Sequence, residues 1–342
     1  MAAVELEGLT KHYGGVRAND SISFAVERGE IFGYLGPNGA GKTTTIRMLL
    51  GLISPTDGSA RVLGADITDE RALIEAKRRI GYLPDDPQFD ESATGREILE
   101  LHAGIKGDER SEKLLDLFDP PLERPIREYS HGNVRKLGLV TAFMHDPELV
   151  ILDEPTGGLD PLMKQRFAEF VRGERDRGRT LFFSSHILGE VRRLCDRVGI
   201  IRSGRVVTVE PIDALVDRSG KVVRLVTADP IPRATFDRDL EGVHDLEVGA
   251  GNRTHDPGGG RTATTDAQSD PTSGPDDSGN KSIGAVGESD RPETFREYTF
   301  TFTGPVDELL AVLSGTELVD LTIEEAPLES VLLRFYGDGD DA

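Results

Sequence analysis

Short runs of strand character alternate with helix-like runs along residues 1–220. The short apolar runs predict strands at Val4–Leu9, Ile22–Val26, Glu30–Leu35, Val150–Leu152 and Thr180–Ser184. Helical spacing of the apolar positions predicts helices at Thr43–Leu52, Arg96–Ala103 and Ser111–Phe118. Strands that alternate with helices in this way are typical of an α/β domain.

The pattern changes beyond Gly220 to that of a small α+β domain at 221–342. Strands are predicted at Val222–Val226, Asp245–Val248, Tyr298–Phe302 and Glu317–Ile323, and helices at Ala234–Leu240, Val306–Leu313 and Leu328–Tyr336. This order fits a ferredoxin-like sandwich. Residues 251–293 between its halves are rich in Gly, Asp, Ser, Thr and Pro, so we expect a disordered insertion that cannot offset its chain entropy by burial.

Charge limits the choice of partner. The sequence carries 40 basic and 61 acidic residues, a net charge of −21, and only nine of the basic residues are lysines. Such a surface repels phosphate backbones, which argues against a nucleic acid as the main partner. An acidic, lysine-poor surface suits high salt, where screening relieves self-repulsion, so we hypothesise a halophilic source. An acidic mesophilic protein is the alternative.

The chain contains no run of 18 or more apolar residues, and its start lacks a basic-then-apolar leader. We therefore expect a cytoplasmic protein with no membrane span of its own. The single cysteine, Cys195, excludes an internal disulfide. It lies in the helix-like stretch Val191–Val198 and is predicted to be a small buried hydrophobic residue rather than a reactive thiol.

A glycine-rich motif of the form G-x-x-x-x-G-K-[ST] stands between a predicted strand and a predicted helix. The expected nucleotide-binding residues are Gly36, Pro37, Asn38, Gly39, Ala40, Gly41, Lys42, Thr43 and Thr44. Glycines let backbone N–H groups approach phosphate oxygens, and the helix adds its positive N-terminal end. Lys42 is expected to reach the β- and γ-phosphates of ATP, and Thr43 to hold Mg²⁺ through its hydroxyl.

A second apolar strand, Leu149–Leu152, ends in Asp153 and Glu154. Taken alone, this pair is as consistent with surface charge as with chemistry. A buried strand that delivers a carboxylate beside a P-loop completes the Mg²⁺ site in P-loop enzymes, which assigns that role to Asp153. Glu154 is then placed to polarise the attacking water.

The run Leu152–Pro161 resembles an ABC-transporter ATPase. Upstream, Tyr129–Asn133 occupies the place of that family's LSGGQ signature. Downstream, Ser184-Ser185-His186 matches the family's switch histidine, and Lys11–Gly14 near the start resembles its aromatic loop. These motifs follow the family's order and roughly its spacing across residues 1–218.

The resemblance implies that two cassettes close head to tail around two ATP molecules. Ser130 and Gly132 would then meet the γ-phosphate held by the other subunit, and Asp160 would lie across the dimer interface. His186 would contact the γ-phosphate and order the water with Glu154, while Tyr13 would stack on adenine. Considered alone, Ser130 is equally well a helix cap, and His186 is more simply a core histidine.

The sequence departs from the family at two motifs. The signature has His131 and Asn133 where Gly and Gln are commonest, although Ser130 and Gly132 are kept. The family's Q-loop glutamine aligns with Asp85. Asp85 is an acceptable oxygen ligand for Mg²⁺ but shorter than glutamine. Gln88 is an alternative substitute.

Ile80–Leu99 resembles the cassettes of ABC-2 type exporters, and so does the tail Leu328–Phe335. In that family the segment 86–94 touches the permease; an ordinary surface loop is the alternative. The expected partners are an integral-membrane permease and a second copy of the chain or a related cassette, at the cytoplasmic face of the membrane. The C-terminal domain resembles the branch's small appended domain, which we hypothesise to stabilise the dimer or contact the permease.

Two other functions are alternatives to transport. A soluble ABC ATPase that remodels ribosomes or nucleic acid usually has a second cassette or a long coiled coil, and this chain shows neither. A regulatory binder with degraded catalysis is disfavoured because Lys42, Asp153, Glu154 and His186 are all present. The sequence therefore predicts an ATP-binding and ATP-hydrolysing subunit, with ATP and Mg²⁺, that powers an ABC-2 type transporter.

Overall fold

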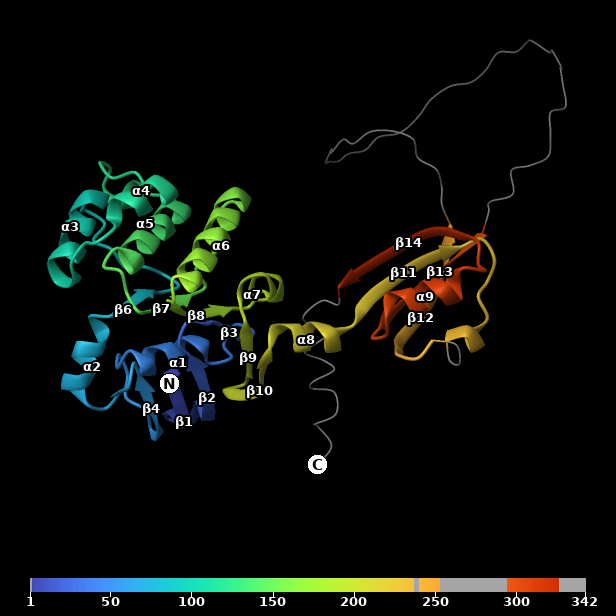
Figure 1. Cartoon of the computed structure of the whole chain (residues 1–342), viewed down its shortest axis with the longest axis horizontal. Helices are drawn as coiled ribbons and strands as arrows, with labels where there is room; N and C mark the ends of the chain where they lie inside the picture. The colour runs from blue at the N-terminus through green and yellow to red at the C-terminus, as the bar shows by residue number, and fades with distance from the viewer. Residues whose placement is uncertain (1, 237–239, 253–293, 326–342) are drawn as a thin grey trace, which may run out of the picture. The chain divides into compact units, whose positions relative to one another are not determined.

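The computed structural model describes residues 2–236, 240–252 and 294–325, and Figure 1 follows the chain through them. These residues fall into two compact units, one within residues 1–219 and the other within residues 220–326. The predicted helix at Leu328–Tyr336 and most of the predicted insertion lie outside the described residues.

A six-stranded sheet forms the centre of the first unit. Its strands are, in spatial order, β10 (Arg205–Pro211), β9 (Arg197–Arg202), β3 (Ile31–Leu35), β8 (Thr180–Ser185), β7 (Leu149–Asp153) and β6 (Ile80–Leu83). All neighbours pair in parallel except β10 and β9. Every residue of β3, β7 and β8 is buried, which explains their nearly continuous apolar sequences. Because the strands are parallel, the carboxyl ends of β3, β8, β7 and β6 meet at one edge of the sheet.

An antiparallel sheet packs against this centre. It contains, in spatial order, β2 (Val16–Glu27), β1 (Ala2–Tyr13), β4 (Asp57–Val62) and β5 (Ala65–Asp66). The predicted strands Val4–Leu9 and Ile22–Val26 are the buried middles of the longer β1 and β2. Phe24 on β2 stacks on Phe32 of β3 with ring centroids 5.2 Å apart, so one apolar core joins the two sheets.

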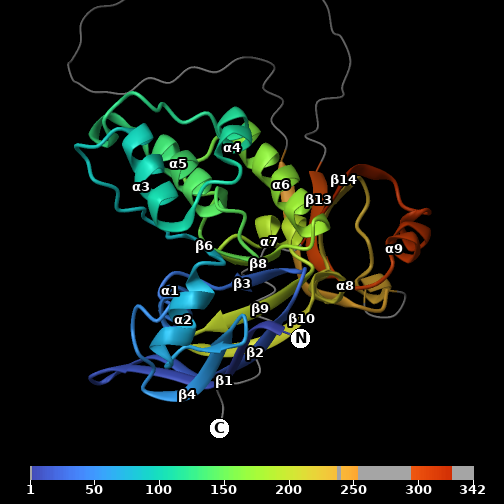
Figure 2. The ribbon, with the colours of Figure 1, turned by 60° about the vertical axis from the view of Figure 1, so that its left-hand side comes forward.

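The helices of the first unit are α1 (Lys42–Leu49), α2 (Glu70–Lys77), α3 (Gly95–Lys106), α4 (Ser111–Phe118), α5 (His131–Phe143), α6 (Pro161–Asp176), α7 (Leu188–Leu194) and α8 (Ile212–Ser219). Helices α3, α4 and α5 lie together at one end of the unit (Figure 2). Throughout the described ranges, every helix is too short or too polar to span a lipid bilayer.

Two local predictions need correction. The helix predicted to reach Leu52 ends at Leu49, because Gly51 takes a positive φ of 60° that stops the helix. The helix-like stretch around Cys195 is also shorter, since α7 ends at Leu194 and the backbone of Cys195 is already extended. Cys195 is nevertheless 5 % exposed, and burial raises the pKa of its thiol, in agreement with an inert core role.

The second unit is a four-stranded antiparallel sheet with one face covered by helix. Its strands are, in spatial order, β12 (Val243–Asn252), β13 (Thr294–Phe302), β11 (Lys221–Thr227) and β14 (Leu318–Glu325). Helix α9 (Val306–Leu313) connects β13 to β14, and its Leu309 and Leu313 share a core with Tyr298, Phe300 and Phe302. This strand order is that of the predicted ferredoxin-like sandwich, while the predicted helix Ala234–Leu240 lies partly outside the described residues.

The start of the predicted insertion is wrong by two residues. Gly251 and Asn252 belong to β12, where they pair with Phe295 and Thr294 of β13. Main-chain pairing with a neighbouring strand satisfies the backbone whatever the side chains are, so composition alone placed this boundary too early.

Candidate active site

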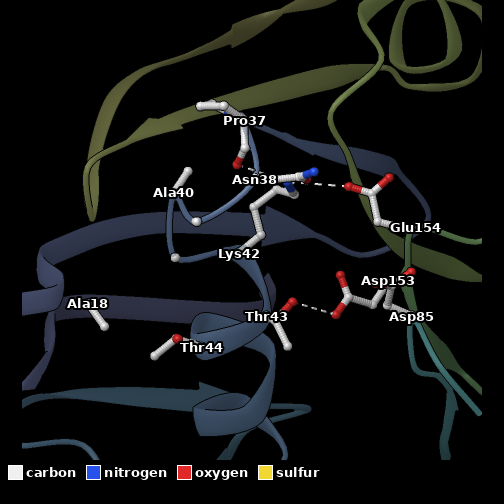
Figure 3. Close-up of a pocket in the computed structure, with 12 residues that line it drawn as sticks. Ala18, Pro37, Asn38, Ala40, Lys42, Thr43, Thr44, Asp85, Asp153 and Glu154 are labelled. Carbon is white, nitrogen blue, oxygen red and sulfur yellow. Dashed lines mark hydrogen bonds and ion pairs between the residues drawn. The ribbon is translucent and has the colours of Figure 1, made fainter. Parts of the chain in front are cut away.

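The glycine-rich loop leaves the end of β3 and enters α1 directly. Gly39 and Gly41 have φ values of 80° and 108°, which side chains other than glycine rarely adopt. A Cβ atom at Gly41 would also lie 2.6 Å from the carbonyl oxygen of Ala18. The loop borders a pocket lined by Ala18, Pro37, Asn38, Gly39, Ala40, Gly41, Lys42, Thr43, Thr44, Asp85, Asp153 and Glu154 (Figure 3).

Lys42 folds over the loop that precedes it. Its Nζ atom donates to the carbonyl oxygens of Gly36 at 2.7 Å and Pro37 at 3.3 Å. The same ammonium lies 3.3 Å from Oε1 of Glu154 (Figure 3). Because the side chain of Lys42 is only 6 % exposed, this buried charge is a strong local attraction for an anion that enters the pocket.

Asp153 ends β7 opposite the start of α1. Its Oδ2 atom accepts a hydrogen bond of 2.9 Å from the hydroxyl of Thr43, and its Oδ1 atom accepts one from Ser184. Asp153 is 1 % exposed, so this carboxylate depends on the two hydroxyl donors. A hydroxyl and a carboxylate are the hard oxygen ligands that Mg²⁺ prefers, and they meet beside the phosphate loop, so the residues fit this ion.

Glu154 lies between the glycine-rich loop and the end of β8. Its Oε2 atom is 2.9 Å from Nδ1 of His186, while its other oxygen faces Lys42. The backbone of Glu154 has a φ of 48°, and its N–H donates to the carbonyl oxygen of Ser184 at 3.2 Å. Strained backbone of this kind is held only where surrounding contacts determine it. His186 is 49 % exposed, so the alternative of a core histidine is wrong.

Comparisons with known proteins agree with this geometry. The ABC transporter family model matches residues 19–157. The daunorubicin/doxorubicin resistance ATP-binding protein DrrA of Streptomyces peucetius is 34 % identical over 336 residues, covering 96 % of this chain and 97 % of the relative. The chain belongs to the ABC transporter ATP-binding proteins. It therefore binds and hydrolyses ATP, as the sequence predicted.

Further relatives of this ABC cassette are also transporter subunits. The bacitracin transport ATP-binding protein BcrA of Bacillus licheniformis is 36 % identical over 251 residues, covering 72 % of this chain and 81 % of the relative. A solved structure of an ATP binding subunit of an ABC transporter is 31 % identical, with a TM-score of 0.58, and covers 63 % of this chain and 92 % of that chain. These relatives give no support to the ribosome or nucleic-acid alternative.

Five expected nucleotide contacts of the cassette do not line this pocket: Tyr13, Gly36, Ser130, Gly132 and Asp160. Tyr13 is 48 % exposed near the tip of the β1–β2 hairpin, with the ammonium of Lys11 5.2 Å from its ring centroid. Ser130 is the N-cap of α5 and accepts from the N–H of Asn133 at 3.3 Å. Asp160 likewise caps α6, accepting from the N–H of Met163 at 2.9 Å.

Asp85, in the place of the family's Q-loop glutamine, follows β6 and lines the pocket. Its Oδ1 atom is 3.3 Å from the guanidinium of Arg135, and its side chain is 63 % exposed. The other residue considered for this place, Gln88, is not among the lining residues and donates to Asp86 at 2.6 Å. Of the two, Asp85 is therefore the one near Asp153.

Sequence reasoning missed three residues that hold this site together. Ser184 bridges Asp153 and Glu154. Glu190 on α7 accepts from Thr156 at 2.6 Å and from Ser185 at 3.3 Å, which ties the turn after Glu154 to the end of β8, directly before His186. Arg135 on α5 is buried against the Asp85 loop. An arginine next to the apolar run 137–144 was the one available signal for such a role.

Proposed function

We propose that Glu154 activates the attacking water in ATP hydrolysis, with His186 orienting it and Lys42 holding the β- and γ-phosphates. The contacts of a single carboxylate support this proposal: one oxygen of Glu154 faces Lys42 and the other faces His186. A base held on both sides keeps its reactive oxygens at the mouth of the phosphate loop, which is the preorganisation that phosphoryl transfer requires.

The same geometry supports a site for Mg²⁺. Thr43 and Asp153 would hold Mg²⁺, and Asp85 would add a third oxygen from the end of β6. The ion would neutralise phosphate charge. The N–H groups of Gly36–Thr44 and the start of α1 would supply the remaining positive field.

We propose that the site is completed by a second cassette, either a second copy of this chain or a related one. Ser130, Gly132 and Asp160 stand at helix N-termini away from the pocket of their own chain, and Asp160 is exposed. A hydroxyl and bare backbone at the start of α5 suit the γ-phosphate of a partner's ATP. In this arrangement Tyr13 would stack on adenine.

Steady-state ATP hydrolysis tests the assignment, together with size measurements in ATP and Mg²⁺. We expect Glu154→Gln to lose turnover and to accumulate as a stable ATP-bound dimer. Glu169→Gln, on the exposed face of α6, is the matched control and should hydrolyse ATP like the wild type. Normal turnover by a monomeric Glu154→Gln variant would remove Glu154 from the mechanism.

We also propose that the cassette powers an ABC-2 type exporter of a small solute, a drug or a surface polymer. It would dock on an integral-membrane permease at the cytoplasmic face, through residues 86–94. The support is the similarity to proteins named for bacitracin transport and for daunorubicin and doxorubicin resistance. Reconstitution with an ABC-2 type permease from the same organism should give ATP-dependent efflux. No binding to that permease would contradict the proposal.

We propose that residues 221–342 form a separate domain, with a disordered insertion, that stabilises the dimer or contacts the permease. The compact second unit supports a separate domain. Deleting 221–342 should leave ATP binding intact and weaken dimer formation or permease binding. Unchanged dimerisation and permease binding would exclude both roles.

The net charge of −21 supports a halophilic origin, because self-repulsion of this size is relieved by salt. We expect the free energy of unfolding to be higher in 3 M KCl than in 0.1 M KCl, measured by chemical denaturation with urea, which is uncharged. Equal stability in the two solutions would contradict this origin.

A further inference from the structure

Arg135 is the largest fully buried side chain of the described residues. It is 1 % exposed and lies in α5, the helix whose N-cap is Ser130. A guanidinium is rarely buried unless its charge and its N–H groups find partners, because removing it from water is costly. The hydrogen-bond partners of the Arg135 guanidinium therefore indicate which segments this residue holds together.

Its contacts reach segments that are far apart in the sequence. One terminal nitrogen donates to the carbonyl oxygens of Pro84 at 2.8 Å and Asp153 at 3.5 Å. The other donates to the carbonyl oxygen and, at 3.3 Å, to the Oδ1 atom of Asp85. A Cβ atom added to Gly157 would lie 3.4 Å from this second nitrogen, so the turn after Glu154 also passes beside it.

These segments carry Asp85 and Asp153, two of the three proposed metal ligands, and the proposed base. The ends of β6 and β7 present Asp85 and Asp153 to the pocket, and the turn that follows Asp153 contains Glu154. Arg135 itself does not line the pocket. Instead, its single guanidinium links the loop after β6 and the end of β7 to α5, the helix whose N-cap is Ser130.

We propose that Arg135 is a positioning residue for ATP hydrolysis. It fixes the Asp85 loop and the end of β7 relative to α5, so that the start of α5 and the hydrolytic residues move as one body. This inference rests on the proposed roles of Asp153 and Glu154.

Arginine suits this position better than lysine. The planar guanidinium offers two terminal nitrogens in a fixed fork, and both are used here on different segments. Burial lowers the pKa of Arg135, while the charges of Asp85 and Asp153 oppose that decrease. A lysine would retain the positive charge but would not bridge both loops.

The main experiment compares Arg135→Lys with the wild type in ATP affinity, steady-state kinetics and thermal unfolding. We expect KM and ATP affinity within about 3-fold of the wild type, because the glycine-rich loop is untouched, and kcat at least about 10-fold lower. Arg166→Lys, on the exposed face of α6, is the control and should behave as the wild type. A folded Arg135→Lys variant with wild-type kcat would overturn the proposal, even if its melting temperature is lower.

A second variant keeps the proposal testable if Arg135→Lys does not fold. Asp85→Asn changes an exposed partner and should preserve the fold. If Asp85 acts partly through Arg135, kcat should fall to the same extent at 1 mM and 10 mM Mg²⁺. Full recovery at the higher concentration would instead make Asp85 a metal ligand alone and would overturn the link to Arg135.

The double variant and Glu154→Gln separate the remaining possibilities. In the Asp85→Asn background, Arg135→Lys should cost less in kcat than it does alone, since the two residues share a contact. Fully additive losses would contradict the coupling. If Glu154→Gln stays active, the proposed function fails. If Glu154→Gln is inactive while Arg135→Lys has wild-type kcat, only the inference about Arg135 fails.

Discussion

The Nδ1 atom of His186 lies 2.9 Å from the Oε2 atom of Glu154, although 32 residues separate them in the sequence. The contact forms because β7 and β8 are parallel neighbours and both side chains leave the same edge of the sheet. It holds the proposed base in place from the side opposite Lys42.

Replacing His186 with alanine removes this hold on Glu154. We expect kcat to fall by about 100-fold, within the range for a group that assists proton transfer, while ATP affinity changes little. Steady-state kinetics and equilibrium ATP binding measure the two quantities. His244→Ala, at an exposed position in the second unit, is the matched control. A loss of affinity without a loss of kcat would assign His186 to binding alone.

Thr43→Val retains the shape of the side chain and removes the hydroxyl that contacts Asp153. Because this hydroxyl is the proposed Mg²⁺ ligand, we expect ATP affinity without Mg²⁺ to be preserved and the gain in affinity on adding Mg²⁺ to be largely lost. Calorimetric titration of ATP in EDTA and in MgCl₂ tests this. An undiminished effect of Mg²⁺ would exclude Thr43 as a ligand.

Glu190 joins Thr156 and Ser185 across the site and also pairs with Lys164 at 3.0 Å. In Glu190→Gln the negative charge that holds these groups is lost, so the turn after Glu154 and the end of β8 before His186 should separate slightly. We expect kcat to fall by about 10-fold with KM unchanged, since misplacing a reacting group costs rate more than binding. Glu169→Gln serves as control. Equal rates in both variants would show that Glu190 only supports the fold.

Glu174 on α6 is 3 % exposed and forms an ion pair with Arg110 at 2.6 Å, next to Asp146. Removing one partner of a buried pair leaves the other charge poorly compensated, so Glu174→Ala should lower the free energy of unfolding by about 3 kcal/mol. Asp176 is exposed and is the last residue of the same helix, so Asp176→Ala should lower the free energy of unfolding by less than about 0.5 kcal/mol. Urea denaturation of both variants distinguishes a buried network from a surface one.

His145 makes the stability of the cassette depend on pH. Burial, with help from the charge of Lys106, lowers its pKa from 6.5 to about 4. Between these values the unfolded chain binds a proton that the folded chain does not, so this contribution to stability falls as pH decreases from 7 toward 4. From pH 7.5 to pH 5 the loss is about 2 kcal/mol. The decrease in the free energy of unfolding from pH 7.5 to pH 5 should be smaller by that amount in His145→Gln. Urea denaturation at both pH values measures it.

The features of this protein that depend on neighbouring residues along the chain could be predicted from the sequence. The phosphate loop needs glycines and a lysine between one strand and one helix, and all of these are consecutive along the chain. The same holds for Asp153 and Glu154 at the end of a buried strand, and for α4 and α9, whose predicted bounds match the structure. Strands of the central sheet are buried on both faces, so they appear in the sequence as continuous apolar runs.

Contacts between residues that are distant in the sequence could not be predicted in this way and are visible only in the folded chain. Ser184, Glu190 and Arg135 act on the site through partners about 30 to 50 residues away in the sequence, a separation that no local pattern records. The strand order β3-β8-β7-β6 brings those partners to one edge, and the order is fixed by the packing of whole layers rather than by any single segment. The extra residues of β12 have the same origin, because the neighbouring strand, and not their own side chains, satisfies their backbone.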